Sequence, residues 1–543
     1  MRPELLFGLS VALSAHWQAA ALKFPFNIPF LSNNDQAPLI DVNTLLPEST
    51  PPNRIAIVGA GAAGSSAAFW IAKAKERFGL DVEVDVYEKN DYIGGRSTVV
   101  YPYNNTEYDP VELGASIFVE INRNMWRATE EFGLERIGFG DENNVMGIWD
   151  GQEFVLTTGG GSFLGSWMDT LKVIWRYGIS APRRTQAVVK SMATQFLTLY
   201  APTTPRFANI TTLASSLGWT PVVASTAAEY FDTQGISRLF TRELVDAATR
   251  VNYGQDVDAL HALEGMCSLA AENAASVKGG NFQVFEQFLQ RSNATVHLKT
   301  EVTSLIQDAA SGAWLVGTGG TTRPRAYRGV VLAAPFYSTA IEVSPPALLT
   351  PVPEQPYVHL HVTLLSTTAR TPSAAYFGLG SGVAPTEVLT THNRVREGLG
   401  EEPEFNSMTY HGKLRKADGA PAERDEWVVK IFSKARVEDA WLENMFGAGN
   451  VGWVLRKEWD AYPVLPPTVS FPPIKLAKGL YYVNAFEPFI STMETETIAS
   501  RNVVDLLLHD EWNAGICPAA VEGDEEATAE KAKDDKFVLG WDC

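Results

Sequence analysis

The chain has 543 residues, which is enough to bury a large core and suggests roughly two to four domains. Apolar residues make up 45% of it and charged residues 20%, a composition typical of globular proteins. The net charge is −19, from 44 Lys and Arg against 63 Asp and Glu. A chain this acidic is not expected to bind nucleic acid or an anionic membrane through a general positive field, although a local basic patch is still compatible with it.

The first residues have the pattern of a secretory signal peptide. Arg2 precedes an apolar run from Leu5 to Trp17, and small residues follow up to Ala21. We therefore expect residues 1–21 to be cleaved and the mature protein to be lumenal or extracellular. A buried helix or a membrane anchor is the alternative, but the run is short for a bilayer span. No later segment is apolar over a sufficient length, so no transmembrane span is expected.

Two further features bear on the compartment and on covalent links. Three glycosylation sequons agree with the secretory route, and they begin at Asn104, Asn209 and Asn293. The chain has three cysteines, of which Cys517 and Cys543 could pair and close the tail, leaving Cys267 as a free thiol in an apolar stretch. No spacing of cysteines or histidines suggests a metal site. His359 and His361 alternate on an expected strand and are interpreted as packing residues.

A β-α-β unit is expected near the N-terminus. Residues 22–52 are rich in Pro, Asn and Asp and are typical of a linker. An apolar strand at 54–58, a helix with apolar residues at helical spacing at 62–78 and an alternating strand at 82–87 then follow. This order and length are those of a β-α-β unit.

The turn between the first strand and the helix has the sequence Gly59-Ala60-Gly61-Ala62-Ala63-Gly64, which fits G-x-G-x-x-G in its required context. Gly59 permits the tight turn, Gly61 lets a diphosphate approach the backbone, and Gly64 allows close packing of the helix on the strand. The N–H groups and the dipole at the start of the helix would hold the diphosphate. A glycine-rich turn without a ligand is the alternative that this motif alone leaves open.

Glu88 strengthens the dinucleotide interpretation. It ends the second strand, 24 residues after Gly64, where a carboxylate can accept hydrogen bonds from ribose hydroxyls. The same carboxylate would repel a 2′-phosphate, so NADP is disfavoured.

The rest of the chain is mostly helical by pattern from 122 to 275, with many aromatic residues. Strand patterns then return, at 296–299, 302–306, 313–316, 330–334, 357–365, 427–432 and 479–483, and a helix follows at 495–508. Residues 522–536 are charged and of low complexity, and we expect them to be mobile.

Two segments after the β-α-β unit indicate which dinucleotide binds. Gly94-Gly95-Arg96 follows Glu88 and Lys89, and Glu112-Leu113-Gly114-Ala115-Ser116 comes next. Both resemble cofactor-contacting turns of the glutathione-reductase-like flavoproteins, which include the monoamine oxidases. The resemblance implies that Arg96 lies beside the cofactor and that residues 114–116 pass close to the isoalloxazine. It also implies that Val302 meets the adenine. FAD is therefore expected rather than NAD.

Shorter segments resemble the prenylcysteine oxidases, also called prenylcysteine lyases. They are Trp175–Ser180 (W-x-Y-G-I-S), Asn252–Gln255, Ser268–Ala270, Gly279–Asn281 and Tyr481–Ala485. Asn484-Ala485 stands where amine oxidases usually carry Gly-Asp or Gly-Thr, and Met493 would offer a backbone N–H to the flavin. The resemblance covers about residues 53–512.

The resemblance implies an α/β fold in which a Rossmann-like FAD-binding domain of the glutathione-reductase type is interleaved with an α+β substrate domain. The FAD-binding parts are expected at 53–120, 279–340 and 476–512. The substrate parts are expected at 121–278 and 341–475, and an acidic tail at 513–543. The family's habit also suggests a lysosome or vacuole as the final compartment.

The family further implies oxidation of a thioether, S-farnesyl- or S-geranylgeranyl-cysteine. FAD would take a hydride from the allylic carbon next to sulfur, water would add, and a prenyl aldehyde and cysteine would leave; O2 would reoxidise the flavin to give hydrogen peroxide. No protein nucleophile is demanded, and no catalytic dyad is evident. The aromatic region from Trp167 to Tyr200 and strands near Tyr357–Leu365 could line the prenyl pocket, and Arg176 is a weak candidate for the cysteine carboxylate.

Two other interpretations of the function remain open from the sequence. The protein could be an FAD oxidase of an amine, or of a prenylated or polyketide metabolite, because the FAD motifs fit that equally well. It could also be a flavin-binding relative that acts as a carrier or interaction module on lipid particles.

Overall fold

The structure is a computed structural model that describes residues 51–138, 145–159, 163–271, 273–320, 323–345, 351–518, 534 and 536–543. The linker expected at 22–52 therefore lies almost wholly outside the described residues, as do the signal-peptide residues and most of 522–536. Among the described helices, none combines the length and the apolar character needed to cross a bilayer.

The β-α-β unit forms as expected and opens a six-stranded sheet. It consists of β1 (Arg54–Val58), α1 (Ala62–Phe78) and β2 (Glu83–Tyr87), and β1 pairs in parallel with β2. The sheet has the order β20-β21-β13-β1-β2-β9. Its other strands are β9 (Thr295–His297), β13 (Gly329–Leu332), β20 (Lys475–Ala477) and β21 (Leu480–Tyr482). Segments far apart in the chain thus meet in one sheet.

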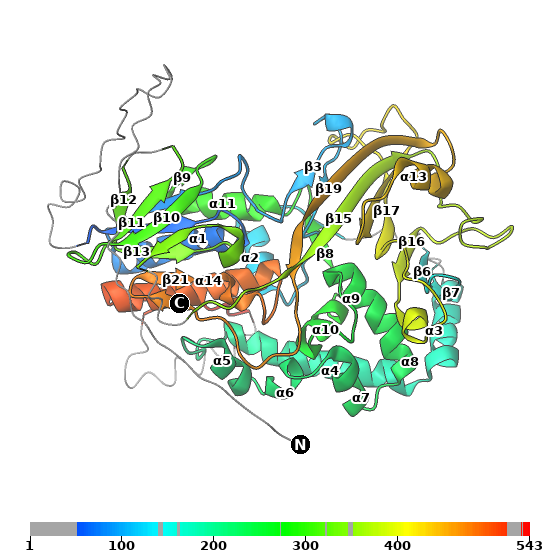
Figure 1. Cartoon of the computed structure of the whole chain (residues 1–543), viewed down its shortest axis with the longest axis horizontal. Coiled ribbons are helices and arrows are strands. Elements are labelled where there is room, and N and C mark those ends of the chain that lie inside the picture. The colour runs from blue at the N-terminus through cyan, green and yellow to red at the C-terminus, as the bar shows by residue number, and fades with distance from the viewer. Residues whose placement is uncertain are drawn as a thin grey trace, which may run out of the picture. The chain divides into compact units, whose positions relative to one another are not determined.

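Helices cover this sheet, which explains its apolar strands. Residues 55–57 of β1 are fully buried, as expected for a parallel strand with helices against it. Helix α1 packs against α11 (Phe282–Ser292) and against α14 (Met493–Trp512), which runs along the sheet in Figure 1. A four-stranded sheet lies next in the chain, made of β10 (Val302–Gln307), β11 (Trp314–Thr318), β12 (Arg325–Tyr327) and β14 (Glu342–Ser344).

A seven-stranded sheet forms the other main β-structure, with the order β19-β15-β18-β17-β16-β6-β7. Its two longest strands, β15 (Tyr357–Thr367) and β19 (Val451–Pro463), are antiparallel neighbours. The remaining strands are β6 (Met146–Trp149), β7 (Phe154–Thr158), β16 (Glu387–Thr390), β17 (Ser407–Lys413) and β18 (Trp427–Ser433). β6 and β7 come from the region that the pattern predicted to be largely helical. They form a local antiparallel hairpin, and β6 joins the sheet by pairing in parallel with the distant strand β16, where Met146 lies opposite Glu387.

The helices of the middle region gather beneath this sheet in Figure 1. They are α3 (Phe163–Tyr177), α4 (Ser180–Leu197), α5 (Ile210–Ser216), α6 (Thr220–Val223), α7 (Ala227–Thr233), α8 (Arg238–Phe240), the π-helical turn η4 (Thr241–Val245), α9 (Asp246–Tyr253) and α10 (Ala262–Leu269). The smaller elements are β3 (Val99–Val100), β4 (Val111–Glu112), β5 (Arg136–Gly138), β8 (Ala275–Val277), α2 (Arg123–Glu131), α12 (Asn393–Arg396) and α13 (Asp439–Phe446), with 3-10 turns η2 (Pro102–Asn104), η3 (Thr198–Tyr200), η5 (Phe336–Ser338) and η6 (Asn484–Phe486).

Helix α2 packs with the nucleotide-binding part, although it lies within residues 121–278. The backbone N–H groups of Asn124 and Met125 donate to the buried carboxylate of Glu494 on α14, at 2.9 and 2.8 Å. A carboxylate that accepts bonds from the start of a helix stabilises that end.

The C-terminal end of the expected acidic tail is held to the rest of the protein by covalent and hydrogen bonds. Cys517 and Cys543 form a disulfide, and Cys267 is free, which confirms that part of the cysteine prediction. The Arg77 guanidinium donates to the carbonyl oxygens of Gly540 and Trp541 at 2.8 and 3.0 Å. Phe537 and Val538 are buried, so this end of the chain packs against the rest of the protein. Residues 519–533 lie outside the described chain.

Candidate functional site

A cavity of about 440 Å³ begins at the turn between β1 and α1 and reaches β15 and β19. Its volume lies within the range of preformed small-molecule sites. Twelve of the fifteen residues expected to bind the cofactor line it: Gly59, Gly61, Ala62, Ala63, Glu88, Lys89, Gly95, Arg96, Gly114, Ala115, Val302 and Met493. Gly64, Ser116 and Ala485 are not among the lining residues.

These three residues lie behind the cavity wall for physical reasons. A Cβ on Gly64 would stand 1.9 Å from the carbonyl oxygen of Gly59, so Gly64 serves helix–strand packing. The Ser116 hydroxyl donates to the Gly114 carbonyl at 2.8 Å and is turned away from the cavity. Ala485 is fully buried in a 3-10 turn, and its neighbour Asn484 takes the place on the wall that was expected of Ala485.

The glycine turn is shaped to hold a ligand against bare backbone. Gly59 has φ +106°, and a Cβ there would lie 2.5 Å from the Ala333 carbonyl oxygen. Gly61 differs from Gly59 in its backbone conformation, because its φ of −77° is one that any residue can adopt. A Cβ on Gly61 would meet no protein atom closer than the Cα of Gly95, at 3.8 Å. The space in front of Gly61 is thus left open by the protein, at the N-terminus of α1, where an anion is favoured.

Glu88 is held rigidly beside this turn. It is buried, and its Oε2 accepts from the backbone N–H of Ala60 at 2.9 Å. Its Oε1 accepts from the backbone N–H and the side-chain amide of Asn90, at 2.8 and 2.7 Å. A fixed carboxylate at the end of β2 is suited to accept hydrogen bonds from a ribose.

The turn at Gly114 is supported from behind by a buried polar network. The backbone N–H of Asn281 donates to Glu112 at 2.6 Å, and its side-chain amide donates to the Ala115 carbonyl at 3.1 Å. The Lys430 ammonium donates to the Glu112 carbonyl at 2.8 Å and to the Ser116 hydroxyl at 2.9 Å. Burial raises the pKa of Glu112 to about 7 and lowers that of Lys430 to about 8.

Charged groups gather where the cavity meets β15. The Arg96 guanidinium contacts the carboxylate of Glu487, and the Tyr357 hydroxyl donates to the same carboxylate. Arg96 also donates to the Ala461 carbonyl at 3.0 Å. Burial opposes the charge of Arg96, but Glu487 outweighs it and raises the pKa of the guanidinium above its ordinary value. This pair fixes polar groups on an otherwise apolar wall.

The apolar wall comes from the seven-stranded sheet. Leu360 on β15, Phe432 on β18, and Trp459 and Tyr462 on β19 line the cavity. The expectation that strands near Tyr357–Leu365 form the pocket therefore agrees with the placement of these side chains.

The aromatic region from Trp167 to Tyr200 was expected to line the pocket, but its described part does not line this cavity. None of the described side chains between 168 and 200 reaches the cavity. Tyr177 packs edge-on against Phe240 at 5.3 Å, and Phe196 packs against Tyr200 at 5.8 Å, because these rings form the core of the helices. Trp175 lies instead on the surface, with 89% of its area exposed.

Arg176 is likewise not a cavity residue. Its guanidinium makes two hydrogen bonds of 2.6 Å to the buried carboxylate of Glu243, so the arginine is already paired within the helical region. The weak prediction that Arg176 receives a substrate carboxylate is corrected by this contact.

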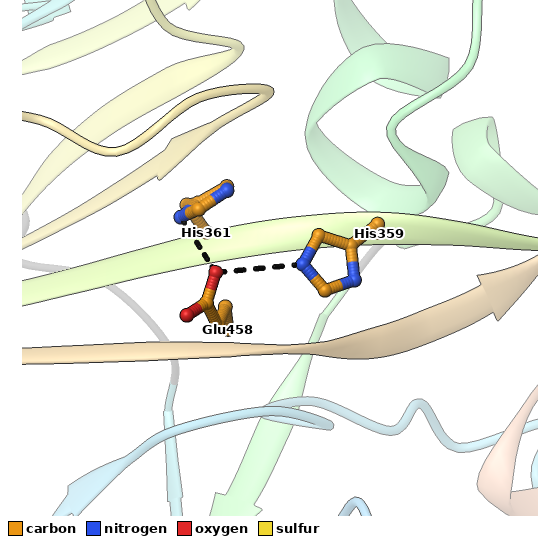
Figure 2. A group of neighbouring side chains, drawn as sticks. All are labelled: His359, His361 and Glu458. Carbon is orange, nitrogen blue, oxygen red and sulfur yellow. Dashed lines mark ion pairs between the residues drawn. The ribbon is translucent and has the colours of Figure 1, made fainter.

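His359 is exposed rather than packed, whereas the side chain of His361 is only 19% exposed (Figure 2). They face Glu458 on β19, with nitrogen–oxygen distances of 3.5 and 3.7 Å, and His359 also contacts Asp460 at 3.1 Å. The three ligand atoms of His359, His361 and Glu458 lie within 4.8 Å of one another, so this group could hold a metal ion. The side chains of His359 and Glu458 are more than half exposed.

For several residues of the site, no sequence motif indicated their role. Asn281 belongs to a segment quoted for the family, but nothing indicated that its amide would hold the Gly114 turn. Lys430 behind the Gly114 turn and Glu487 on the cavity wall are brought to the site by strand pairing and chain return over long separations, which a local pattern does not encode.

Comparison with known proteins gives two family-model matches. The model described as prenylcysteine lyase matches residues 164–517, and the NAD(P)-binding Rossmann-like domain model matches residues 57–132. Farnesylcysteine lyase of Arabidopsis thaliana is 30% identical over 480 residues, which cover 85% of this chain and 89% of that protein. Prenylcysteine oxidase 1 of Homo sapiens is 28% identical over 490 residues, covering 85% and 90%.

The chain belongs to the prenylcysteine lyase family. Among solved structures, cyclohexylamine oxidase from Brevibacterium oxydans aligns with a TM-score of 0.52 at 16% identity, covering 84% of this chain and 99% of that one. Wild-type putrescine oxidase aligns with a TM-score of 0.51 at 15% identity over the same shares. At these identities the likeness shows the fold, which confirms the expected α/β architecture with a Rossmann-like domain.

The dinucleotide of this site is FAD. The open space at Gly61, the fixed Glu88 and the helix N-terminus fit an adenine dinucleotide diphosphate. The cavity then continues past Gly95 and Gly114 to Met493, which gives room for a second ring system beyond the diphosphate. The protein is an FAD-dependent oxidoreductase.

Proposed function

We propose that this protein oxidises and cleaves S-prenyl-L-cysteine, with a farnesyl or geranylgeranyl chain, using O2 and water. The products are a prenyl aldehyde, free cysteine and hydrogen peroxide. The carbon next to sulfur is oxidised by two electrons and the C–S bond breaks, while O2 is reduced to peroxide. The observation that carries the proposal is the continuity of the FAD cavity with an apolar wall, in a chain of this family.

FAD, when bound, supplies the oxidising step by accepting a hydride from the carbon attached to sulfur. The chain's own residues then have to bind and orient the substrate. Leu360, Phe432 and Trp459 offer the apolar surface that a prenyl chain needs. Once the substrate is bound, these side chains would shield its allylic carbon from bulk water.

The cysteine end of the substrate carries an ammonium and a carboxylate, which need polar partners. Arg96 and Glu487 are the paired charges on the wall, and Asp460 lines the cavity nearby. We assign recognition of the amino-acid end to this side of the cavity. The rigid pairing of Arg96 with Glu487 and Tyr357 would keep the polar contacts in one place.

The same proposal includes the secretory route, with a signal peptide, N-linked glycans and a lysosome or vacuole as destination. Asn104, Asn209 and Asn293 are all exposed, which supports glycan attachment. Treatment of the protein from a eukaryotic host with an N-glycosidase should lower its apparent mass. An unchanged mass would remove the glycans from the proposal.

The experiment that tests the activity compares substrates with the purified holoprotein. S-farnesyl-cysteine should release hydrogen peroxide and free cysteine in equal amounts, whereas S-methylcysteine and simple amines should release neither. Peroxide from amines alone would favour the amine-oxidase alternative. FAD binding without turnover of either class would favour a non-enzymatic carrier and contradict the proposal.

A further inference from the structure

Helix α3 presents an apolar stripe to solvent. The exposed fractions of Met168, Leu171 and Trp175 are 54%, 44% and 89%, and Ile179, in the turn after the helix, is 50% exposed. The spacing of three and four residues places Met168, Leu171 and Trp175 on one side of the helix, and Ile179 follows in the turn after it. Large side chains that are exposed singly are common, but an aligned set that includes an almost fully exposed tryptophan is not.

The opposite side of the helix is firmly anchored, so the stripe does not result from a loose helix. Tyr177 lies about 200° around the axis from Trp175 and is buried. Its hydroxyl donates to Glu243 at 2.9 Å, and Arg176 pairs with the same carboxylate. The packed side of α3 is therefore satisfied within the protein, while the stripe has no counterpart in the described chain.

The FAD cavity does not account for the stripe, because none of the described side chains of α3, from Met168 to Tyr177, lines it. In Figure 1, α3 lies at the outer edge of the helices, beside β7. Trp175 and Ile179 also belong to the segment that resembles the family's W-x-Y-G-I-S run. The packing of the chain gives these two side chains no role.

The charges around the stripe have the opposite sign to the rest of the protein. Residues 163–197, which include α3 and α4, contain five Lys or Arg and a single Asp, whereas the whole chain has a net charge of −19. Two of the five are already paired, Arg176 with Glu243 and Lys172 with Asp169. Lys172 follows the stripe on α3 and is exposed. Arg183, Arg184 and Lys190 are exposed on α4. Arg183 and Lys190 lie opposite its buried residues Ala181, Thr185, Met192 and Phe196, and Arg184 lies at the flank, where its guanidinium donates to the Gly235 carbonyl.

We propose that the apolar stripe of α3 (Met168, Leu171, Trp175 and Ile179), together with the basic face of α4 (Arg183, Arg184 and Lys190), docks onto an anionic lipid bilayer. An apolar helix face with a tryptophan, flanked by Lys and Arg, has the chemistry of an interfacial helix. Basic side chains near the surface are attracted to anionic headgroups. Because the rest of the protein is acidic, such a bilayer repels its other faces and selects this one.

Docking would hold the enzyme at the lipid bilayer, into which a prenylated thioether partitions. This link to the substrate rests on the proposed function, whereas the docking itself rests only on the stripe and its charges. Vesicle binding is therefore measured without substrate, so that a failure of the proposed activity leaves the docking test unaffected.

The test is flotation of the full-length holoprotein with phosphatidylcholine vesicles, with and without phosphatidylserine. The wild type should float with the anionic vesicles and much less with the neutral ones. The double variant Leu171→Ser/Trp175→Ala should lower the partition coefficient about 10-fold or more, because it removes most of the insertable apolar area. The variant Arg183→Glu/Lys190→Glu should remove the gain given by phosphatidylserine.

Val383→Ser is the matched control, since Val383 is 76% exposed in a loop outside α3 and α4. It should bind vesicles like the wild type, and all variants should keep the wild-type thermal unfolding midpoint. Failure of the wild type to float, or equal flotation of Leu171→Ser/Trp175→Ala, overturns the proposal. If that variant instead converts a wild-type dimer into a monomer, as measured by light scattering, the stripe is an interface between copies and the proposal is wrong.

Discussion

The cavity has two walls, one formed largely by backbone and the other by large side chains. On the side of α1, much of the wall is backbone, and Gly61 leaves open the space in which a side chain would stand. On the side of β15 and β19, the wall is made of large side chains such as Leu360 and Trp459. The backbone wall is damaged most by adding atoms, and the side-chain wall mainly by removing them. The first is suited to one fixed cofactor, and the second can be reshaped for different substrates on the same fold.

The largest expected effect comes from adding atoms to the backbone wall. Gly61→Val should abolish FAD binding, because the side chain would fill the space of the diphosphate. The protein itself can accept the change, since φ at Gly61 is −77° and no protein atom is closer than 3.8 Å to the new Cβ. The purified variant should be folded and colourless.

Gly138→Val is the control for this change. Gly138 ends β5, and a Cβ there would meet nothing within 4 Å. It should retain flavin at the wild-type stoichiometry. A yellow Gly61→Val protein would show that the diphosphate lies elsewhere.

A smaller effect is expected when a charge is removed from the same wall. Glu88→Gln keeps the size of the side chain but loses the charge-assisted hydrogen bonds to the ribose, which are worth about 1.5–3 kcal/mol. The dissociation constant for FAD, measured by titration of the apoprotein, should rise by roughly 10- to 100-fold. Glu83→Gln, on the exposed start of the same strand, should leave it unchanged. Equal affinities for wild type and Glu88→Gln would remove Glu88 from the site.

On the side-chain wall the effect of removing atoms should fall on the substrate. Phe432→Ala deletes apolar surface that would contact the prenyl chain, so KM for S-farnesyl-cysteine should rise by about 10-fold or more. FAD content should stay the same. Trp427→Ala, on the same strand β18 but outside the cavity, is the control. A loss of FAD with unchanged KM would reverse the assignment of the two walls.

A buried acid connects the helices to the cofactor side of the cavity and adds a pH dependence. Glu264 accepts from the backbone N–H of Ser491, a cavity residue, at 3.2 Å. Burial raises the pKa of Glu264 to about 8, above its value in the unfolded chain. The folded protein therefore holds a proton that the unfolded chain has lost, and this contribution to stability is full below about pH 4.5 and fades as pH rises through 8.

Glu264→Gln should flatten this dependence, because the amide does not titrate. The free energy of unfolding, measured by denaturant titration at pH values below and above this window, should fall less with pH in the variant than in the wild type. Identical slopes would mean that Glu264 is ionised in the folded protein.

The smallest effect on catalysis is expected at Arg176. Because its guanidinium is paired with Glu243 away from the cavity, Arg176→Ala should leave KM unchanged. The variant should be less stable by about 1–3 kcal/mol, since a buried carboxylate loses a partner. A raised KM at unchanged stability would restore Arg176 as a substrate contact.

The difference between the two walls also explains how much could be predicted from the sequence. Gly59 to Gly64, Glu88 and Arg96 lie within about forty residues, and their spacing encodes one local unit. The other wall depends on pairing of β15 with β19, whose strands are separated by more than eighty residues, and on Lys430 and Asn281 reaching the Gly114 turn. Aromatic residues in helices gave a false signal, because packing inside the helical region uses the same residue types as a lipid pocket.

The most direct test of the two-walled site is anaerobic mixing of the oxidised holoprotein with S-farnesyl-cysteine, followed by flavin absorbance. The account predicts bleaching of the flavin by the prenylated thioether, and much slower bleaching in Phe432→Ala at the same substrate concentration. Persistent yellow colour with S-farnesyl-cysteine, together with rapid bleaching by an amine, would contradict it.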